Sequence, residues 1–165
     1  MLTDSMAPLI HPGDQIMVSK VPAEQVRSGD IIVFSRNGEL IVHRVLKIRL
    51  TNSGIRFVEK GDSSGVCGLF SSDDVIGRVT MVKGKGKIFN LNSPLSRLTS
   101  RALSVWPYWT SAIATRLRAS SNKNLRRAGR VLLRLLLLSS NVLIRICCVV
   151  WYVSGMKYRK NAESN

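Results

Sequence analysis

Between Gln15 and Val82 the sequence is a series of short apolar runs, rich in Val and Ile, that are separated by turn-forming residues. Runs of this length and composition favour β-strands. The step RNGE, from Arg36 to Glu39, places Asn-Gly between two runs, which is a strong signal for a hairpin. We therefore expect a mainly β fold with a compact antiparallel core or partial barrel. The strand candidates are QIMVSKV, DIIVFS, LIVHRVLKI, IRFVEK and DVIGRVTMV.

This pattern ends near Gly86, and the rest of the chain favours helix. Pro94 and Pro107 are expected to break the segment that follows into loop and short helix. From Asn122 to Val153 there is no proline and leucine dominates, which predicts one long helix. The chain therefore divides into a β-rich core over residues 1–86, a linker with short helices over 87–121, and an α-helical appendage over 122–160.

Charge divides the chain at the same place. Residues 1–86 carry eleven Lys or Arg against nine Asp or Glu, whereas residues 87–165 carry fourteen against one. A basic half of this kind favours a polyanionic neighbour, either nucleic acid or an anionic membrane surface. On the expected long helix the cations form a narrow stripe within an otherwise apolar surface, which suits contact with lipid. The stripe consists of the cations Lys123, Arg127, Arg130, Arg134 and Arg145, with the polar Asn141 on the same line.

We therefore expect membrane lipids to be a partner through this helix, and we expect no nucleic-acid partner. Two arrangements remain open. The helix can lie in the bilayer interface, or Leu135 to Val153 can span the bilayer, since a span needs about 20 apolar residues. Arg145 would then stand near the middle of the span, at a cost of about 2.5 to 3.5 kcal/mol.

Metal and disulfide chemistry have little support in the sequence. Cys67 stands alone, and Cys147 and Cys148 are adjacent, without CxxC or histidine spacing. We expect all three to be buried or lipid-facing, and we expect no metal and no cofactor.

The candidates for chemistry are Ser5, His43 and Asp62. A serine hydroxyl needs a neighbouring base, and that base needs a group that sets its tautomer. The chain has only two histidines, and His43 stands in the apolar run LIVHRV. Asp62 follows the run IRFVEK directly and is the candidate orienting group. Taken alone, a histidine in a strand is more often structural, so spacing does not decide between the two interpretations.

The combined pattern resembles a known family. SMAPLIHPGDQIMV resembles the nucleophile box of type I signal peptidases and their self-cleaving repressor relatives. GDIIVF, VHRV and KGDSSG with DVIGRV resemble the next boxes, in the same order. The resemblance runs from about Thr3 to Val82. It implies the antiparallel β core of that superfamily, and His43 in place of lysine resembles the endoplasmic-reticulum and archaeal type.

The resemblance implies a serine endopeptidase that cleaves precursor or leader peptides after small residues. Ser5 would attack the peptide carbonyl, His43 would act as base, and Asp62 matches the aspartate of the last box. The Ser5 N–H and the Thr3 hydroxyl would stabilise the oxyanion. Met6 and Pro8 would shape the turn that presents Ser5 and its substrate pocket.

The sequence departs from the family in two main respects. Many histidine-type members have a second aspartate where this chain has Gly68, and Asp73 or Asp74 is a candidate replacement. Members also carry a membrane helix directly before the serine, and we expect the basic C-terminal helix to serve as the anchor here. The sequence leaves open which side of the membrane Ser5 faces.

Two alternatives come from other classes. A self-cleaving repressor would need a DNA-binding domain before the serine. A non-catalytic membrane- or nucleic-acid-binding protein could retain the same β fold. Salt would separate its two kinds of partner, because binding to nucleic acid weakens steeply as the salt concentration rises.

Overall fold

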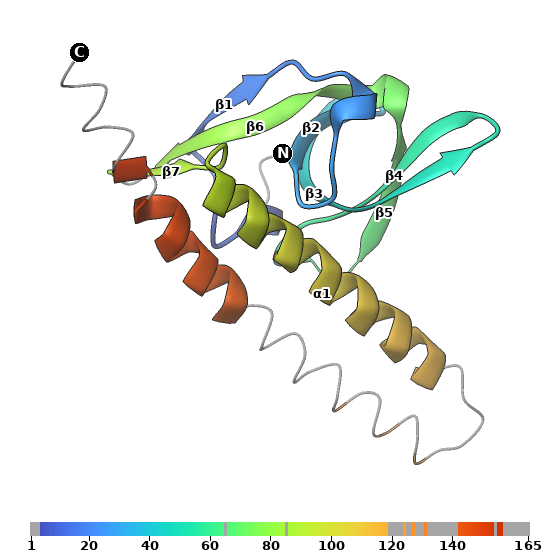
Figure 1. Ribbon diagram of the computed structural model, residues 1–165. Coiled ribbons are helices and arrows are strands. Elements are labelled where there is room, and N and C mark those ends of the chain that lie inside the picture. Colours follow the sequence, from blue (N-terminus) through green and yellow to red (C-terminus); the bar gives the residue numbers. More distant parts are fainter. Residues whose placement is uncertain are drawn as a thin grey trace.

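The computed structural model describes residues 4–64, 66–84, 86–118, 142–153 and 155–156, together with 124, 127 and 131. The elements follow one another from a β-rich N-terminal part to a helical C-terminal part (Figure 1). The strands are β1 (Gln15–Ser19), β2 (Ile31–Arg36), β3 (Glu39–Thr51), β4 (Gly54–Lys60), β5 (Cys67–Ser71), β6 (Val75–Gly84) and β7 (Lys87–Asn90). Short 3-10 helices are η1 (Asp4–Met6), η2 (Ala23–Gln25) and η3 (Ser72–Asp74), and α1 spans Pro94–Arg118.

All seven strands belong to one antiparallel sheet, which confirms the predicted mainly β fold. Its order is β1-β6-β2-β3-β4-β5, and β7 also pairs with β6. The hairpin predicted from Asn-Gly connects β2 and β3. Asn37 has φ 52° and Gly38 has φ 80°, the left-handed conformations that a tight hairpin turn of this kind requires.

The sheet curls on itself, so that β2 and β5 face each other although two strands lie between them (Figure 1). The rings of Phe34 on β2 and Phe70 on β5 stack with centroids 4.1 Å apart. Side chains alternate between the two faces of a strand. Ile32 and Phe34 therefore point into the curl, whereas Ile31 and Val33 point to the opposite face, toward the helices.

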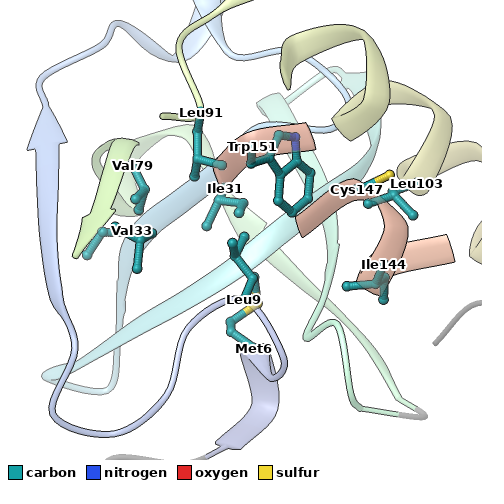
Figure 2. Packing of buried hydrophobic residues seen from close by; sticks show 11 residues of the cluster. Met6, Leu9, Ile31, Val33, Val79, Leu91, Leu103, Ile144, Cys147 and Trp151 are labelled. Atoms are coloured by element: carbon teal, nitrogen blue, oxygen red, sulfur yellow. The ribbon is translucent and has the colours of Figure 1, made fainter. Parts of the chain in front are cut away.

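The helical part packs against that second face. Trp151 is fully buried and lies with Ile31 and Leu9 in one cluster, to which Ile144 and Cys147 also belong (Figure 2). Ile144, Cys147 and Trp151 recur at helical spacing within 142–153, so their side chains share one side of the helix. The Trp151 ring N–H donates to Thr99 Oγ1 of α1 at 2.9 Å, which joins the two helical segments.

Several details of the helical part differ from the sequence analysis. Residues 87–90, which the sequence analysis assigned to the linker, form β7. This strand pairs with the end of β6, beyond the β6 residues that pair with β2. The helix α1 continues through Pro107, where a break was expected. Its first turns are held against the sheet through buried Ser96, Ser100 and Leu103, and tertiary packing of this kind overrides local propensity.

Only part of the predicted long helix lies within the described residues. Residues 142–153 are helical, and Arg127 and Arg145 are exposed, whereas Lys123, Arg130, Arg134 and Asn141 lie outside the described residues. Cys67 is exposed, contrary to expectation, because it opens the edge strand β5. Within the described part of the chain, no helix has the length and hydropathy needed to cross a bilayer.

Candidate active site

Ser5 lies in η1, which is held by the loop that follows β4. The backbone N–H of Ser63 donates to the Ser5 carbonyl at 2.9 Å, and the Ser63 hydroxyl donates to the Asp4 carbonyl at 2.6 Å. Gly61 permits this close approach, because a Cβ there would lie 2.6 Å from the Ser5 carbonyl oxygen and 2.9 Å from its Cβ. The loop after β4 therefore fixes the position of Ser5 through Gly61 and Ser63.

His43 on β3 brings its ring to Ser5. Its Nε2 lies 3.1 Å from Ser5 Oγ, so the serine hydroxyl can donate its hydrogen to this nitrogen. The side chain is half-buried, and the ring of Phe34 lies beside it with centroids 6.3 Å apart. The structure thus brings together two of the three residues that the sequence singled out for chemistry.

The other ring nitrogen of His43 contacts Glu59 of β4. Nδ1 and Glu59 Oε2 are 2.5 Å apart, and Glu59 Oε1 accepts a hydrogen bond from Arg36 Nη2 at 2.9 Å. Glu59 is 2% exposed. Burial by itself would raise the pKa of its carboxyl group, but the hydrogen bond and charge of His43, followed by those of Arg36, lower this pKa below its ordinary value.

Asp62 has a different partner. Arg44 donates to both of its carboxylate oxygens, from Nε at 2.8 Å and from Nη2 at 2.6 Å. Arg44 is the strand neighbour of His43, so its side chain leaves the opposite face of β3. Arg44 and Asp62 thus form a buried salt bridge on that face. The structure therefore places Asp62 against Arg44, and it places Glu59 against His43.

The remaining predicted residues have varied positions. Met6 is buried in the cluster that contains Leu9, and Pro8 lies in the turn that follows. Thr3 lies outside the described residues. Asp73 and Asp74 belong to η3 beyond the far end of β5, where Asp74 accepts the Ser71 N–H at 2.9 Å as a local cap.

A cleft of about 640 Å³ opens beside Ser5 and His43. One wall comes from the loop between η1 and β1, including Ile10 and His11, and the other from the start of β3. In the part of the chain that the structure describes, β3 pairs with β2 alone between Glu39 and His43, because its pairing with β4 begins at Arg44. An open strand edge therefore runs along the cleft toward Ser5.

The arrangement can generate a nucleophile. In the tautomer with its proton on Nδ1, His43 accepts the Ser5 hydrogen at Nε2, and the hydroxyl oxygen faces a cleft of peptide size. The described residues include no group of three or more His, Cys, Asp or Glu side chains that could hold a metal ion.

The sequence analysis did not single out Glu59, because IRFVEK was interpreted only as a strand. A signal was present: Glu59 stands two residues after Phe57, so both side chains leave the same face of a strand whose phenylalanine predicts burial. A buried carboxylate needs partners. Identifying His43 as one of them requires the register of β3 and β4, which the sequence does not provide.

Comparison with known proteins identifies a similar family. A family model described as Peptidase S24-like matches residues 2–60, the segment that contains Ser5, His43 and Glu59. Residues 2–60 are therefore similar to Peptidase S24-like domains, which confirms the resemblance stated from the sequence boxes.

Particular relatives are also identified. The chain is 38% identical over 68 residues to the signal peptidase complex catalytic subunit SEC11C of Homo sapiens, Mus musculus and Canis lupus familiaris. The matched segment covers 39% of this chain and 35% of each relative, so the chain spans about a third of their length. No solved structure matches the chain significantly.

Proposed function

We propose that this protein is a serine endopeptidase of the signal peptidase type, with Ser5 as nucleophile and His43 as general base. The observation that supports this most directly is the 3.1 Å approach of Ser5 Oγ to His43 Nε2 at the wall of an open cleft. The similarity to proteins named as catalytic subunits of the signal peptidase complex supports the same assignment.

The reaction would proceed in two halves. Ser5 Oγ attacks the peptide carbonyl carbon while His43 Nε2 takes the hydroxyl proton. The tetrahedral intermediate collapses, the C–N bond breaks, and the imidazolium returns its proton to the leaving amine. Water then attacks the acyl-serine while His43 takes its proton. The acyl C–Oγ bond breaks, His43 returns the proton to Ser5 Oγ, and the carboxylic acid product leaves. The Ser5 N–H and the Thr3 hydroxyl are proposed to stabilise the oxyanion.

The proposed substrates are extended precursor or leader peptides. The open edge of β3 between Glu39 and His43 can pair with an added strand, which would carry a peptide carbonyl past Ser5. The cleft is lined largely by apolar side chains, among them Ile10, Ile16 and Val42. The preference for small residues before the cut comes from the family resemblance.

We further propose that the helical part holds the enzyme on an anionic lipid surface. Residues 142–153 bury one side in the core, but Val142, Ile146, Val149 and Val153 recur on another side and are exposed. Leu95 and Leu98 of α1 are exposed as well. Residues 87–165 carry fourteen Lys or Arg against one acidic residue, which favours an anionic surface over a neutral protein partner.

The activity is tested with an internally quenched peptide that contains Ala-X-Ala, incubated with the full chain in detergent micelles. We expect cleavage after the second alanine, and we expect Ser5→Ala and His43→Ala each to reduce kcat/KM by at least about 10³-fold. Cleavage at the wild-type rate by either variant would contradict the proposal and would leave a non-catalytic binding protein as the better interpretation.

A further inference from the structure

Glu59 is a buried carboxylate that has no role in the proposed steps of Ser5 and His43. It is 2% exposed on a central strand, with β3 on one side and β5 on the other. Burying a carboxylate is costly unless charged and hydrogen-bonding partners compensate. The position of these partners therefore indicates what the carboxylate does.

The register of the sheet directs Glu59 to His43. Glu59 stands opposite Val45 on β3, and His43 is two residues from Val45 on the same face, so the two side chains are diagonal neighbours. One carboxylate oxygen contacts His43 Nδ1 at 2.5 Å, and the other accepts from Arg36 at 2.9 Å. Arg36 is fixed in turn by the carbonyl of Leu69 at 2.9 Å.

Gly68 provides the room for this carboxylate. It is the direct partner of Glu59 on β5. A Cβ at position 68 would lie 2.0 Å from Glu59 Oε1 and 3.2 Å from Arg36 Nη2. The backbone of Gly68 is not among the positive-φ glycines, so an L-residue could adopt its conformation. Glycine is therefore required here for space.

We propose that Glu59 is the positioning residue of the site: it accepts the Nδ1–H of His43, keeps Nε2 free to take the Ser5 proton, and stabilises the imidazolium that forms. Arg36 and the missing side chain at Gly68 hold it in place. This role rests on the proposed peptidase function. Asp62, the candidate from the sequence, is bonded through both oxygens to Arg44 and is the competing assignment.

The first test removes the charge and keeps the shape. We expect Glu59→Gln to reduce kcat by about 10²- to 10⁴-fold with KM nearly unchanged, because the wrong tautomer of His43 becomes accessible. The pH–rate profile of this variant is compared with that of the wild type. The charged groups that face the ring directly or through one partner are Glu59 on β4 and Arg36 on β2. Glu24→Gln, at an exposed site on η2, is the charge-matched control and should behave as wild type.

The second test moves the carboxylate across the sheet. Glu59→Ala should lose activity as Glu59→Gln does. Adding Gly68→Asp to Glu59→Ala places a carboxylate on the facing strand, in the space that Glu59 occupied, and should recover at least about ten-fold, or 1.4 kcal/mol. By contrast, Gly68→Ala alone should reduce activity by displacing Glu59, and should have little further effect in the Glu59→Ala background. Gly68→Asp rescue is an outcome that a merely structural role for Glu59 would not produce.

The outcomes separate this inference from the proposed function. If Ser5→Ala is inactive while Glu59→Gln keeps the wild-type kcat and pH profile, the positioning role is overturned and the peptidase function stands. If the wild-type chain cleaves no peptide, the contact between His43 and Glu59 can still be tested by NMR through the Nδ1–H of His43. We expect a strongly downfield Nδ1–H resonance that disappears in both His43→Ala and Glu59→Gln. Its persistence in Glu59→Gln would overturn the contact on which the inference rests.

Discussion

At the scale of single residues, Glu59 and Asp62 are two carboxylates close in sequence that take different roles. Asp62 pairs with Arg44. Arg44 is 1% exposed and also donates to the Gly29 carbonyl at 3.1 Å. Burial would lower the pKa of its guanidinium group, but the charge and hydrogen bonds of Asp62 raise this pKa above its ordinary value. Asp62 thus neutralises Arg44 on one face of β3, and Glu59 contacts His43 on the other face.

This division predicts different effects for the two carboxylates. Asp62→Asn leaves Arg44 buried without its counter-charge and should reduce the free energy of unfolding by about 3 to 5 kcal/mol. The double variant Arg44→Met with Asp62→Asn should recover much of that loss, because no unpaired charge remains. Urea denaturation of the three proteins measures this. Equal stability of Asp62→Asn and wild type would contradict the structural role assigned to the pair.

The sequence predicts part of this site and not the rest, for physical reasons. Ser5 and His43 could be singled out because serine and histidine chemistry is specific and the surrounding boxes are ordered. Glu59 could not be assigned to His43, because a one-residue change of register between β3 and β4 would turn it to the other face. Asp62 could be found as a candidate, but its partner Arg44 is recognised only once the loop after β4 is placed.

At the scale of elements, Trp151 is the residue that joins the C-terminal helical residues to the β core. Its ring is fully buried in the cluster that contains Ile31 and also Met6 and Leu9, which follow Ser5 closely in the chain (Figure 2). It also lies under Arg44, whose guanidinium carbon is 5.5 Å from the ring centroid. The helical segment therefore forms part of the support for the site.

Removal of this side chain should be costly. We expect Trp151→Ala to lower the free energy of unfolding by about 3 to 5 kcal/mol through the lost burial and the cavity that remains. Val149→Ala, at an exposed position on the same helix, is the control and should change it by less than about 0.5 kcal/mol. Denaturation monitored by circular dichroism gives both values, and a neutral Trp151→Ala would mean that this helix does not pack as described.

Sequence patterns predicted the elements with uneven success. The runs that became β1, β2, β3, β4 and β6 are rich in Val and Ile and bounded by turns, so composition alone indicates them. The strands β5 and β7 were not identified. β5 contains Gly68 and forms an edge, and β7 has only four residues beside the basic turn KGKGK. Their pairing comes from neighbours in space rather than from local preference.

At the scale of the whole molecule, the buried and exposed sides of residues 142–153 define how the protein would sit on lipid. The side with Ile144, Cys147 and Trp151 is used by the core. The side with Val142, Ile146, Val149 and Val153 is exposed, with the exposed cation Arg145 beside it, and is the proposed lipid contact. Truncation would expose the core, so point variants of the full chain are the appropriate probes.

We expect the full chain to float with vesicles of phosphatidylcholine and phosphatidylglycerol and to bind vesicles of phosphatidylcholine alone more weakly. Ile146→Ser with Val149→Ser should reduce the partition coefficient by at least about ten-fold, since each apolar side chain contributes about 1.5 to 3 kcal/mol on burial. Leu50→Ser, at an exposed position on the β3–β4 hairpin, is the matched control and should float as wild type does. Unchanged flotation of the double variant would exclude this face as the lipid contact.

The central claim is that Ser5 and His43 act as one catalytic unit, and a double-mutant cycle tests it most directly. The values of kcat/KM for the Ala-X-Ala peptide are measured with the wild type, Ser5→Ala, His43→Ala and the double variant. Residues that share one proton transfer are strongly non-additive, so the double variant should be no slower than the slower single variant, within about three-fold. Losses that multiply in the double variant would contradict the claim, as would a single variant with wild-type activity.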